Sequence, residues 1–142
     1  MNYYSLNNIA PNTTFETAVI KGLAPDRGLY FPKNITALDP SFFETIETLS
    51  NEEIAYEAIK QFISPEIPEA VLKTIVSETL NFDFPVVKLT DSISTLELFH
   101  GPTMAFKDVG ARFMARCLGY FNKNNSNEVT VLVATSGDTG GA

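Results

Sequence analysis

The sequence LFHGPTMAFKD, residues 98–108, separates a short apolar run from a helical pattern and places Lys107 where the two meet. Its Gly-Pro pair predicts a turn, and Asp108 is typical of a first helical turn. The apolar residues 104–106 are expected to exclude water from the lysine, and the positive end of a helix dipole disfavours a second positive charge. Both effects favour a neutral, reactive amine. An ordinary surface lysine at a helix start is the alternative that these residues leave open.

The residues on either side predict an α/β arrangement. Apolar side chains on two adjacent stripes predict a helix over 108–121, and short apolar runs at 86–89 and 95–99 predict strands before it. The run VTVLVA, residues 129–134, is typical of a strand covered on both faces and therefore of a parallel sheet. Strand, helix and strand from 95 to 134 would then form a right-handed βαβ crossover.

The small residues TSGDTGGA, 135–142, follow that last strand. Free backbone N–H groups and hydroxyls at such a position can hold an anion, although a tight strand-to-helix turn would look the same. The spacing matches neither a dinucleotide fingerprint nor a P-loop. Because the carboxyl ends of parallel strands meet at one edge, we expect this loop to lie near Lys107.

The first half of the chain is predicted to be mostly helical. A helix over 14–21 would begin at a capping box of Thr13 and Glu16, and a turn and a short strand at 29–31 would follow. Asp39 and Pro40, and then Ser50 and Glu53, are start signals of further helices, and the first of these helices is expected to bury Phe42, Phe43, Ile46 and Leu49. A last helix is expected between Pro68 and Asn81. We place a domain boundary where the periodicity changes, giving domains at 1–84 and 85–142.

Composition excludes several classes of partner. The formal net charge of −7 argues against a nucleic-acid groove or an anionic membrane surface. A single cysteine excludes an intrachain disulfide. With only one histidine as well, the chain is predicted to have no metal site. The N-terminus lacks a basic start followed by an apolar run, and no apolar stretch approaches the roughly 18 residues of a membrane span. We therefore expect a cytoplasmic protein.

The stretches HGPTMAFKD, ATSGDTGGA and FETAVIKGLAPDRGLYFP make the chain resemble the N-terminal part of the threonine synthase family. This family belongs to the fold-type II enzymes that use pyridoxal 5'-phosphate. The resemblance implies a small, mostly helical N-terminal domain followed by the start of a parallel-sheet domain that binds the cofactor. It also implies a lyase of threonine biosynthesis that converts O-phospho-L-homoserine and water into L-threonine and phosphate.

The resemblance also implies roles for individual residues. Lys107 would hold the cofactor through its amine and then act as acid and base, and Asp138 would contact the cofactor. Ser136, Gly137, Asp138 and Thr139 would receive the carboxylate of the substrate. Related fold-type II enzymes carry asparagine where this chain has Asp138, which leaves the details of that contact open.

Other residues near these motifs are assigned no chemistry. His100 is expected to be a turn histidine bonded to backbone, and Cys117 to belong to the core. Arg112 and Arg116 lie one turn apart and could point toward a phosphate, but a solvated helix face is the commoner arrangement for such a pair.

The length of the chain and the unknown substrate specificity leave alternative functions open. Members of the family are several times longer, so we expect a fragment that neither retains the cofactor tightly nor turns over substrate by itself. The residues that bind the cofactor phosphate and the oligomeric state are not given by this sequence. Another fold-type II reaction on a hydroxy or phospho amino acid is one alternative. A non-catalytic module, binding an anion at 135–141 or a protein through helices 39–81, is another.

Overall fold

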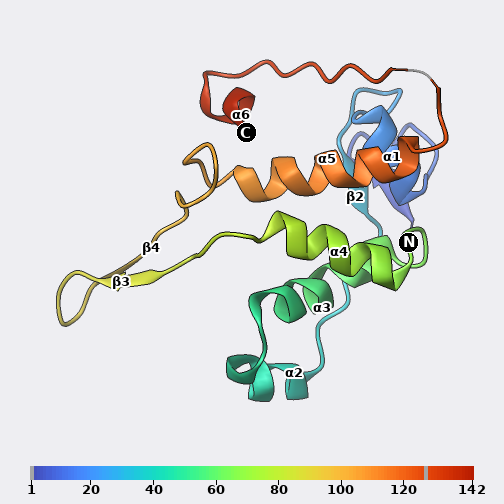
Figure 1. Ribbon diagram of the computed structural model, residues 1–142. Coiled ribbons are helices and arrows are strands. Elements are labelled where there is room, and N and C mark those ends of the chain that lie inside the picture. Colours follow the sequence, from blue (N-terminus) through green and yellow to red (C-terminus); the bar gives the residue numbers. More distant parts are fainter. Residues whose placement is uncertain (1, 127) are drawn as a thin grey trace. The chain divides into compact units, whose positions relative to one another are not determined.

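The computed structural model describes residues 2–126 and 128–142, and it divides them into two compact units. One unit runs to Ser77 and the other from Glu78 to Ala142. Figure 1 shows that helices and short strands occur in both units, in keeping with the α/β class that the sequence predicts.

The first unit begins with a small antiparallel sheet. Strand β1 (Tyr3–Ser5) pairs with β2 (Tyr30–Pro32), and helix α1 (Phe15–Lys21) lies between them in sequence. The predicted capping box of Thr13 and Glu16 is wrong. Thr13 forms an isolated bridge with Tyr3, so the cap falls one residue later. Thr14 takes its place, and its side chain accepts the amide hydrogen of Thr17.

The Asp26 carboxylate holds together the turn between α1 and β2. It accepts hydrogen bonds from the Ser5 hydroxyl at 2.6 Å and from the backbone amides of Ile9 and Ala10 at 3.1 and 2.8 Å. The Ser5 hydroxyl is the main reason that the pKa of Asp26 falls to about 2, and the amides of Gly28, Ala10 and Ile9 lower it further. One side chain thus ties β1 and its following loop to the turn before β2.

Three helices and one 3₁₀ turn complete the first half of the chain: α2 (Pro40–Thr45), η1 (Ile46–Thr48), α3 (Asn51–Ile63) and α4 (Glu69–Thr79). Two helix starts form as predicted. Asp39 accepts the amide hydrogen of Ser41 at 2.9 Å, and Ser50 with Glu53 makes both bonds of a capping box. Both signals are local, so neighbouring residues suffice to define them.

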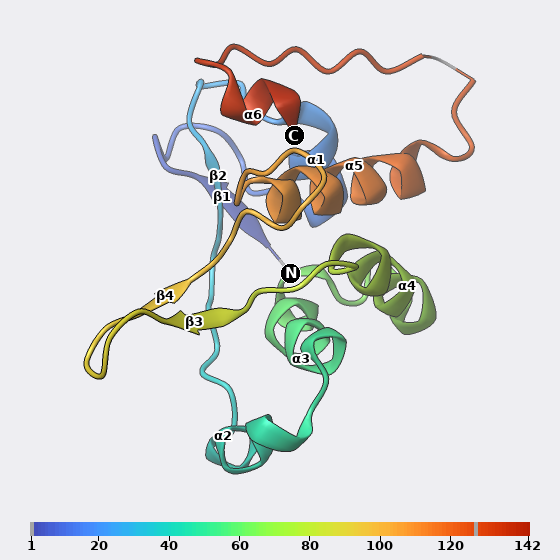
Figure 2. The ribbon, with the colours of Figure 1, turned by 60° about the vertical axis from the view of Figure 1, so that its left-hand side comes forward.

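The core of the first unit lies along α3 and α4, which run side by side in Figure 2. Its buried apolar residues include Ile63, Ile67, Leu72, Ile75 and Val76. Tyr3 reaches this region and donates from its hydroxyl to the Phe62 carbonyl at 2.9 Å, and burial, with Glu66 adding to it, raises its pKa to about 12. The expectation that α2 buries Phe43 is wrong. The helix breaks at Ile46 into a 3₁₀ turn, and Phe43 is exposed.

The second unit contains a hairpin and two helices. Strand β3 (Val86–Lys88) pairs antiparallel with β4 (Ser94–Leu96), and α5 (Asp108–Asn122) and α6 (Asp138–Gly141) follow. The predicted helix over 108–121 is therefore present. The predicted parallel crossover is not formed in the described residues, where β4 pairs only with β3, in an antiparallel hairpin.

Residues 129–134 are not a strand in the structure. Figures 1 and 2 draw them as an extended coil that passes along α5. The run has the composition of a central strand, but such a strand needs a neighbour whose N–H and C=O groups it can bond. Neither β3 nor β4 pairs with this run, and residues 129–134 remain extended without a ladder.

Candidate active site at the Lys107 turn

A closed turn precedes α5 and ends at Lys107. The Met104 amide donates to the Gly101 carbonyl at 3.0 Å, and the Asp108 amide donates to Ala105 at 3.0 Å. Met104 has φ +56°, a left-handed conformation that is unusual for a residue with a side chain. Lys107 is the residue before the helix, with φ −68° and ψ −13°, so its backbone already follows the helical path.

The carboxylate of Asp108 fastens this turn to the helix. Asp108 is only 1% exposed, and it accepts hydrogen bonds from the Thr103 amide at 3.0 Å and the Thr103 hydroxyl at 2.6 Å. The Thr103 hydroxyl is the main reason that the pKa of Asp108 is lowered. A side chain at Gly101 would place its Cβ 2.3 Å from the Asp108 Oδ2, so this close approach requires glycine. Sequence analysis gave Asp108 no such role, and a spacing of five residues from Thr103 matches no capping signal.

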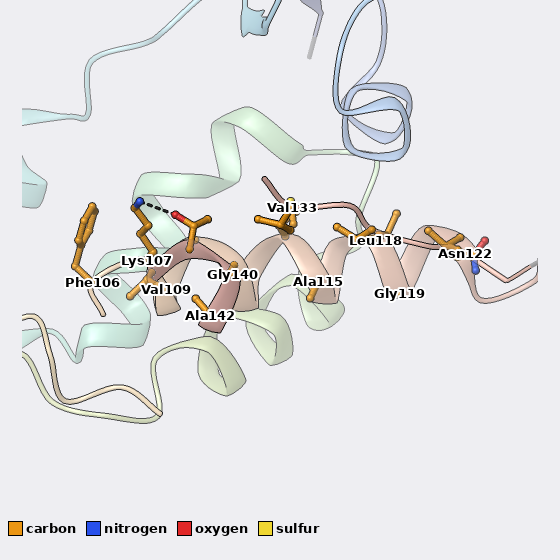
Figure 3. Close-up of a pocket in the computed structure, with 16 residues that line it drawn as sticks. Phe106, Lys107, Val109, Ala115, Leu118, Gly119, Asn122, Val133, Gly140 and Ala142 are labelled. Atoms are coloured by element: carbon orange, nitrogen blue, oxygen red, sulfur yellow. Dashed lines mark hydrogen bonds between the residues drawn. The ribbon is translucent and has the colours of Figure 1, made fainter. Parts of the chain in front are cut away.

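The ammonium group of Lys107 lies against the loop that follows residues 129–134. Its Nζ donates to the Thr139 hydroxyl at 2.5 Å and is 3.2 Å from the Asp138 Oδ2 (Figure 3 shows the Lys107 side chain and its bond). The pKa of Asp138 is lowered, first by the Thr139 amide and then by Lys107. Residues 32 positions apart, from the two motifs singled out in the sequence, are thus in direct contact.

The expected desolvation of Lys107 by its apolar neighbours is wrong. Met104 is 78% exposed and Phe106 is 62% exposed, because the turn directs both side chains outward. The Lys107 side chain itself is 36% exposed. Its immediate surroundings are the hydroxyl and carboxylate of the loop, together with the Phe106 ring, whose centroid is 6.0 Å from Nζ.

A cavity of about 890 Å³ extends from Lys107 along α5. Figure 3 shows Lys107, Ala115, Leu118 and Asn122 along the helix. Apart from Phe106 and Val109, the lining residues on and before the helix follow the spacing of one helical face: Lys107, Gly110, Ala111, Met114, Ala115, Leu118, Gly119 and Asn122. Val129, Val131 and Val133 line the other side. The predicted stripe of helix residues is therefore partly a groove wall.

The other predicted site residues lie farther along the loop. Ser136 is exposed, and the Gly137 amide donates to the Thr135 hydroxyl at 3.2 Å. Gly137 has φ +139°, which a residue with a side chain rarely adopts. Of the four loop residues predicted to bind substrate, Asp138 and Thr139 are those that contact Lys107.

The residues that were assigned no chemistry have structural partners. The His100 Nε2 lies 2.7 Å from the Glu97 Oε2, so its partner is a carboxylate and the expected backbone bond is wrong. Arg112 donates to the Glu78 carbonyl at 2.6 Å, and Arg116 pairs with the Glu78 carboxylate at 2.8 Å. Cys117 is buried as predicted, and burial raises the pKa of its thiol to about 11.

The described residues contain neither a metal-binding cluster nor a helix suited to cross a membrane. No group of three or more histidine, cysteine, aspartate or glutamate side chains is arranged to hold a metal ion in residues 2–126 and 128–142. Within the same residues, none of the helices combines the length and apolar character that crossing a membrane would require.

Comparison with known proteins gives a consistent family. A family model described as "Threonine synthase N terminus" matches residues 2–80. A threonine synthase of Buchnera aphidicola subsp. Schizaphis graminum is 42% identical over the whole chain, and that of Escherichia coli strain K12 is 37% identical. In both cases the chain spans about a third (33%) of the relative's length.

Solved structures agree with the sequence relatives. The crystal structure of threonine synthase from Escherichia coli superposes with a TM-score of 0.90 at 36% identity, covering 99% of this chain and 32% of that one. A structure described as PLP-bound threonine synthase from Brucella melitensis superposes with a TM-score of 0.81 at 34% identity, and the match covers 87% of this chain and 28% of that one. The similarity therefore extends beyond the region of the family model.

Proposed function

Because the chain belongs to the threonine synthase N-terminus family, we propose that it supplies the cofactor lysine and part of the substrate loop of a threonine synthase. The reaction would convert O-phospho-L-homoserine and water into L-threonine and phosphate with the help of pyridoxal 5'-phosphate. One observation carries the assignment within the chain, namely the contact of Lys107 with Thr139. The lyase class, the cytoplasmic location and a domain division between residues 84 and 85 are part of the same proposal.

The groove beside Lys107 fits a small planar cofactor. Small-molecule sites commonly measure about 300–1,000 Å³, and the cavity of about 890 Å³ falls within this range. Gly110 faces open space on the groove wall, and a primary amine stands at one end beside a hydroxyl and a carboxylate. Among the described lining residues, Lys107 is the one basic side chain, so the cofactor phosphate would need a donor from elsewhere.

Each residue of this chain would have a separate task. Lys107 would hold the cofactor through Nζ, and once the substrate amine takes its place, the freed amine would accept and return protons. Thr139 and Asp138 orient Nζ in the present structure, and they would orient the freed amine in the same way while the substrate amine occupies its place. The bound cofactor would supply an electron sink for the carbanions of the reaction.

The loop at 136–139 would bind the substrate carboxylate. The Gly137 amide now donates to Thr135 and the Thr139 amide to the Asp138 Oδ1 at 2.8 Å. A carboxylate would have to replace these internal bonds, which is feasible because both are exposed. The Ser136 hydroxyl is also exposed and could add a further donor.

Binding of the cofactor can be tested on the chain alone. Pyridoxal phosphate is added, the adduct is reduced with borohydride, and the modified lysine is located by mass spectrometry. Because the groove would hold pyridoxal phosphate beside Nζ, we expect Lys107 to be modified ahead of the exposed Lys88, with weak retention of unreduced cofactor after dialysis. Lys107→Ala should abolish the specific modification, and Lys88→Ala is the matched control. Equal modification of all lysines would contradict the proposal.

The reaction itself can be tested in a chimera. The chain replaces the matching region of the Escherichia coli enzyme, and phosphate and threonine are measured after adding O-phospho-L-homoserine. We expect both products in equal amounts, and none from the Lys107→Ala chimera. Phosphate without threonine would favour another fold-type II elimination instead. An active Lys107→Ala chimera would favour a non-catalytic role for this chain.

A further inference from the structure

Asp108 is a buried carboxylate that does not serve as the ion-pair partner of its neighbour in sequence. The Lys107 ammonium pairs with Asp138 at 3.2 Å, whereas both oxygens of Asp108 accept bonds from Thr103. The positively charged side chain that influences Asp108 is Arg112, one turn along α5, and its effect is smaller than that of Thr103. The charge of Asp108 is therefore committed to the turn before the helix.

The position of the Lys107 side chain depends on this turn. Lys107 precedes the first residue of α5, and its own side chain makes no capping bond to the helix. The point from which this side chain starts is set by the backbone between Gly101 and Asp108, which includes the left-handed Met104, and its Nζ is then held by Thr139 and Asp138. The two bonds from Thr103 to Asp108 close this segment from within, and Gly101 leaves the space that the carboxylate occupies.

We propose that Asp108 is a positioning residue for Lys107: by holding Thr103 through two hydrogen bonds it fixes the turn, and the turn keeps the Lys107 Nζ against Thr139. An acid near a helix N-terminus also interacts favourably with the helix dipole. That interaction would stabilise α5 whether or not residue 103 carries a hydroxyl. The positioning role requires the Thr103 hydroxyl, and this difference makes the two roles separable. The importance of the position for function rests on the proposed cofactor role of Lys107.

Lysine reactivity reports this positioning without the cofactor. In competitive labelling, a trace of acetic anhydride acetylates each unprotonated and accessible lysine amine, and mass spectrometry gives the rate for every lysine. In the unchanged chain we expect slow labelling of Lys107, because its Nζ is bonded to Thr139 and paired with Asp138. Lys123, the residue at the other end of α5, is the internal control.

Three variants test the proposal. Asp108→Asn and Thr103→Val should each increase the labelling rate of Lys107 several-fold and leave that of Lys123 unchanged. Thr103→Ser keeps the hydroxyl and should retain the slow rate. Circular dichroism checks that each variant is folded, and if Asp108→Asn does not fold, Thr103→Val decides. This variant keeps the Asp108 charge and its dipole interaction.

The outcomes separate the roles clearly. An unchanged Lys107 rate in folded Thr103→Val would overturn the proposal, as would a rise at Lys107 and Lys123 together, which indicates general loosening of the helix. A fast rate in Thr103→Ser would also overturn it. Because no pyridoxal phosphate is present, failure of the proposed function would instead appear in the cofactor-trapping experiment, as indiscriminate lysine modification.

Discussion

Glu66 caps a helix that begins 51 residues earlier in the sequence, at Phe15. Its two carboxylate oxygens accept the backbone amide hydrogens of Phe15 and Glu16 at 3.0 and 2.8 Å. These amides belong to the first turn of α1, where the helix itself provides no acceptor. A side chain just after α3 thus completes the start of α1, and a negative charge at that end also suits the helix dipole.

Replacing Glu66 should therefore destabilise the first unit. We expect Glu66→Ala to lower the free energy of unfolding by about 1 kcal/mol, the usual cost of losing a helix cap. Urea unfolding followed by circular dichroism measures this. Glu16→Ala removes an acid from the same helical turn without removing the acceptor, and it should have a smaller effect. Equal effects of the two variants would mean that the capping bonds contribute nothing specific.

Gly28 should tolerate no side chain. A Cβ at this position would lie 2.0 Å from the Ser5 hydroxyl oxygen and 2.9 Å from the Asn7 amide nitrogen. We expect Gly28→Ala to cost about 1–3 kcal/mol, as overpacking usually does. Gly119→Ala is the control, because a Cβ on this helical glycine meets nothing within 4 Å. It should leave stability unchanged or raise it by up to about 1 kcal/mol. Thermal unfolding of both variants checks the difference.

Leu72 should dominate the core energetics of α4. Its side chain is fully buried, so Leu72→Ala should lower the free energy of unfolding by about 2–5 kcal/mol. Phe43→Ala removes a larger side chain from α2 but should cost only about 0.5 kcal/mol or less, because that side chain is exposed. Urea unfolding of the two variants should rank them in this order. The reverse ranking would mean that Phe43 is buried, as the sequence suggested.

Acid should weaken the Asp26 turn in a defined pH range. The pKa of Asp26 is about 2 in the folded chain, below the value near 3.9 of an unfolded aspartate. The carboxylate therefore stabilises the fold fully above pH 4, and this contribution is lost as the pH falls toward 2. Asp26→Asn should lower stability at pH 7 and flatten its decrease between pH 4 and 2. Urea midpoints across this range test it, with the exposed Asp91→Asn as control.

Most signals that depend on neighbouring residues were predicted correctly from the sequence, the exception being the start of α1, where Thr14 and not Thr13 is the cap. The Asp39 cap and the capping box of Ser50 and Glu53 need only a spacing of two or three residues, and the helix from Asp108 onward follows from its apolar periodicity. The family assignment is also confirmed, since its motifs are contiguous stretches.

Features that depend on distant partners were not predictable in the same way. The antiparallel pairing of β3 with β4 joins residues across a loop, and the composition of residues 129–134 suggests a partner strand that they lack in the described residues. The Lys107 turn is closed by Thr103 and Asp108 and contains a left-handed Met104, and the exposed Met104 and Phe106 side chains leave the lysine unburied. The roles proposed for Ser136 to Thr139 stay predictions.

The extended run at 129–134 also determines how the isolated chain should behave at high concentration. The run is uncharged, contains no proline and is rich in valine, and Leu132 is 90% exposed. Backbone groups left without a ladder in such a segment can pair with the same segment of another molecule, and this is how fibrils with cross-β order begin. Concentrated solutions should therefore bind thioflavin T over time, and Leu132→Lys should delay it. The solubility of the isolated chain therefore depends on keeping residues 129–134 of different molecules apart, whereas the helices impose no such condition.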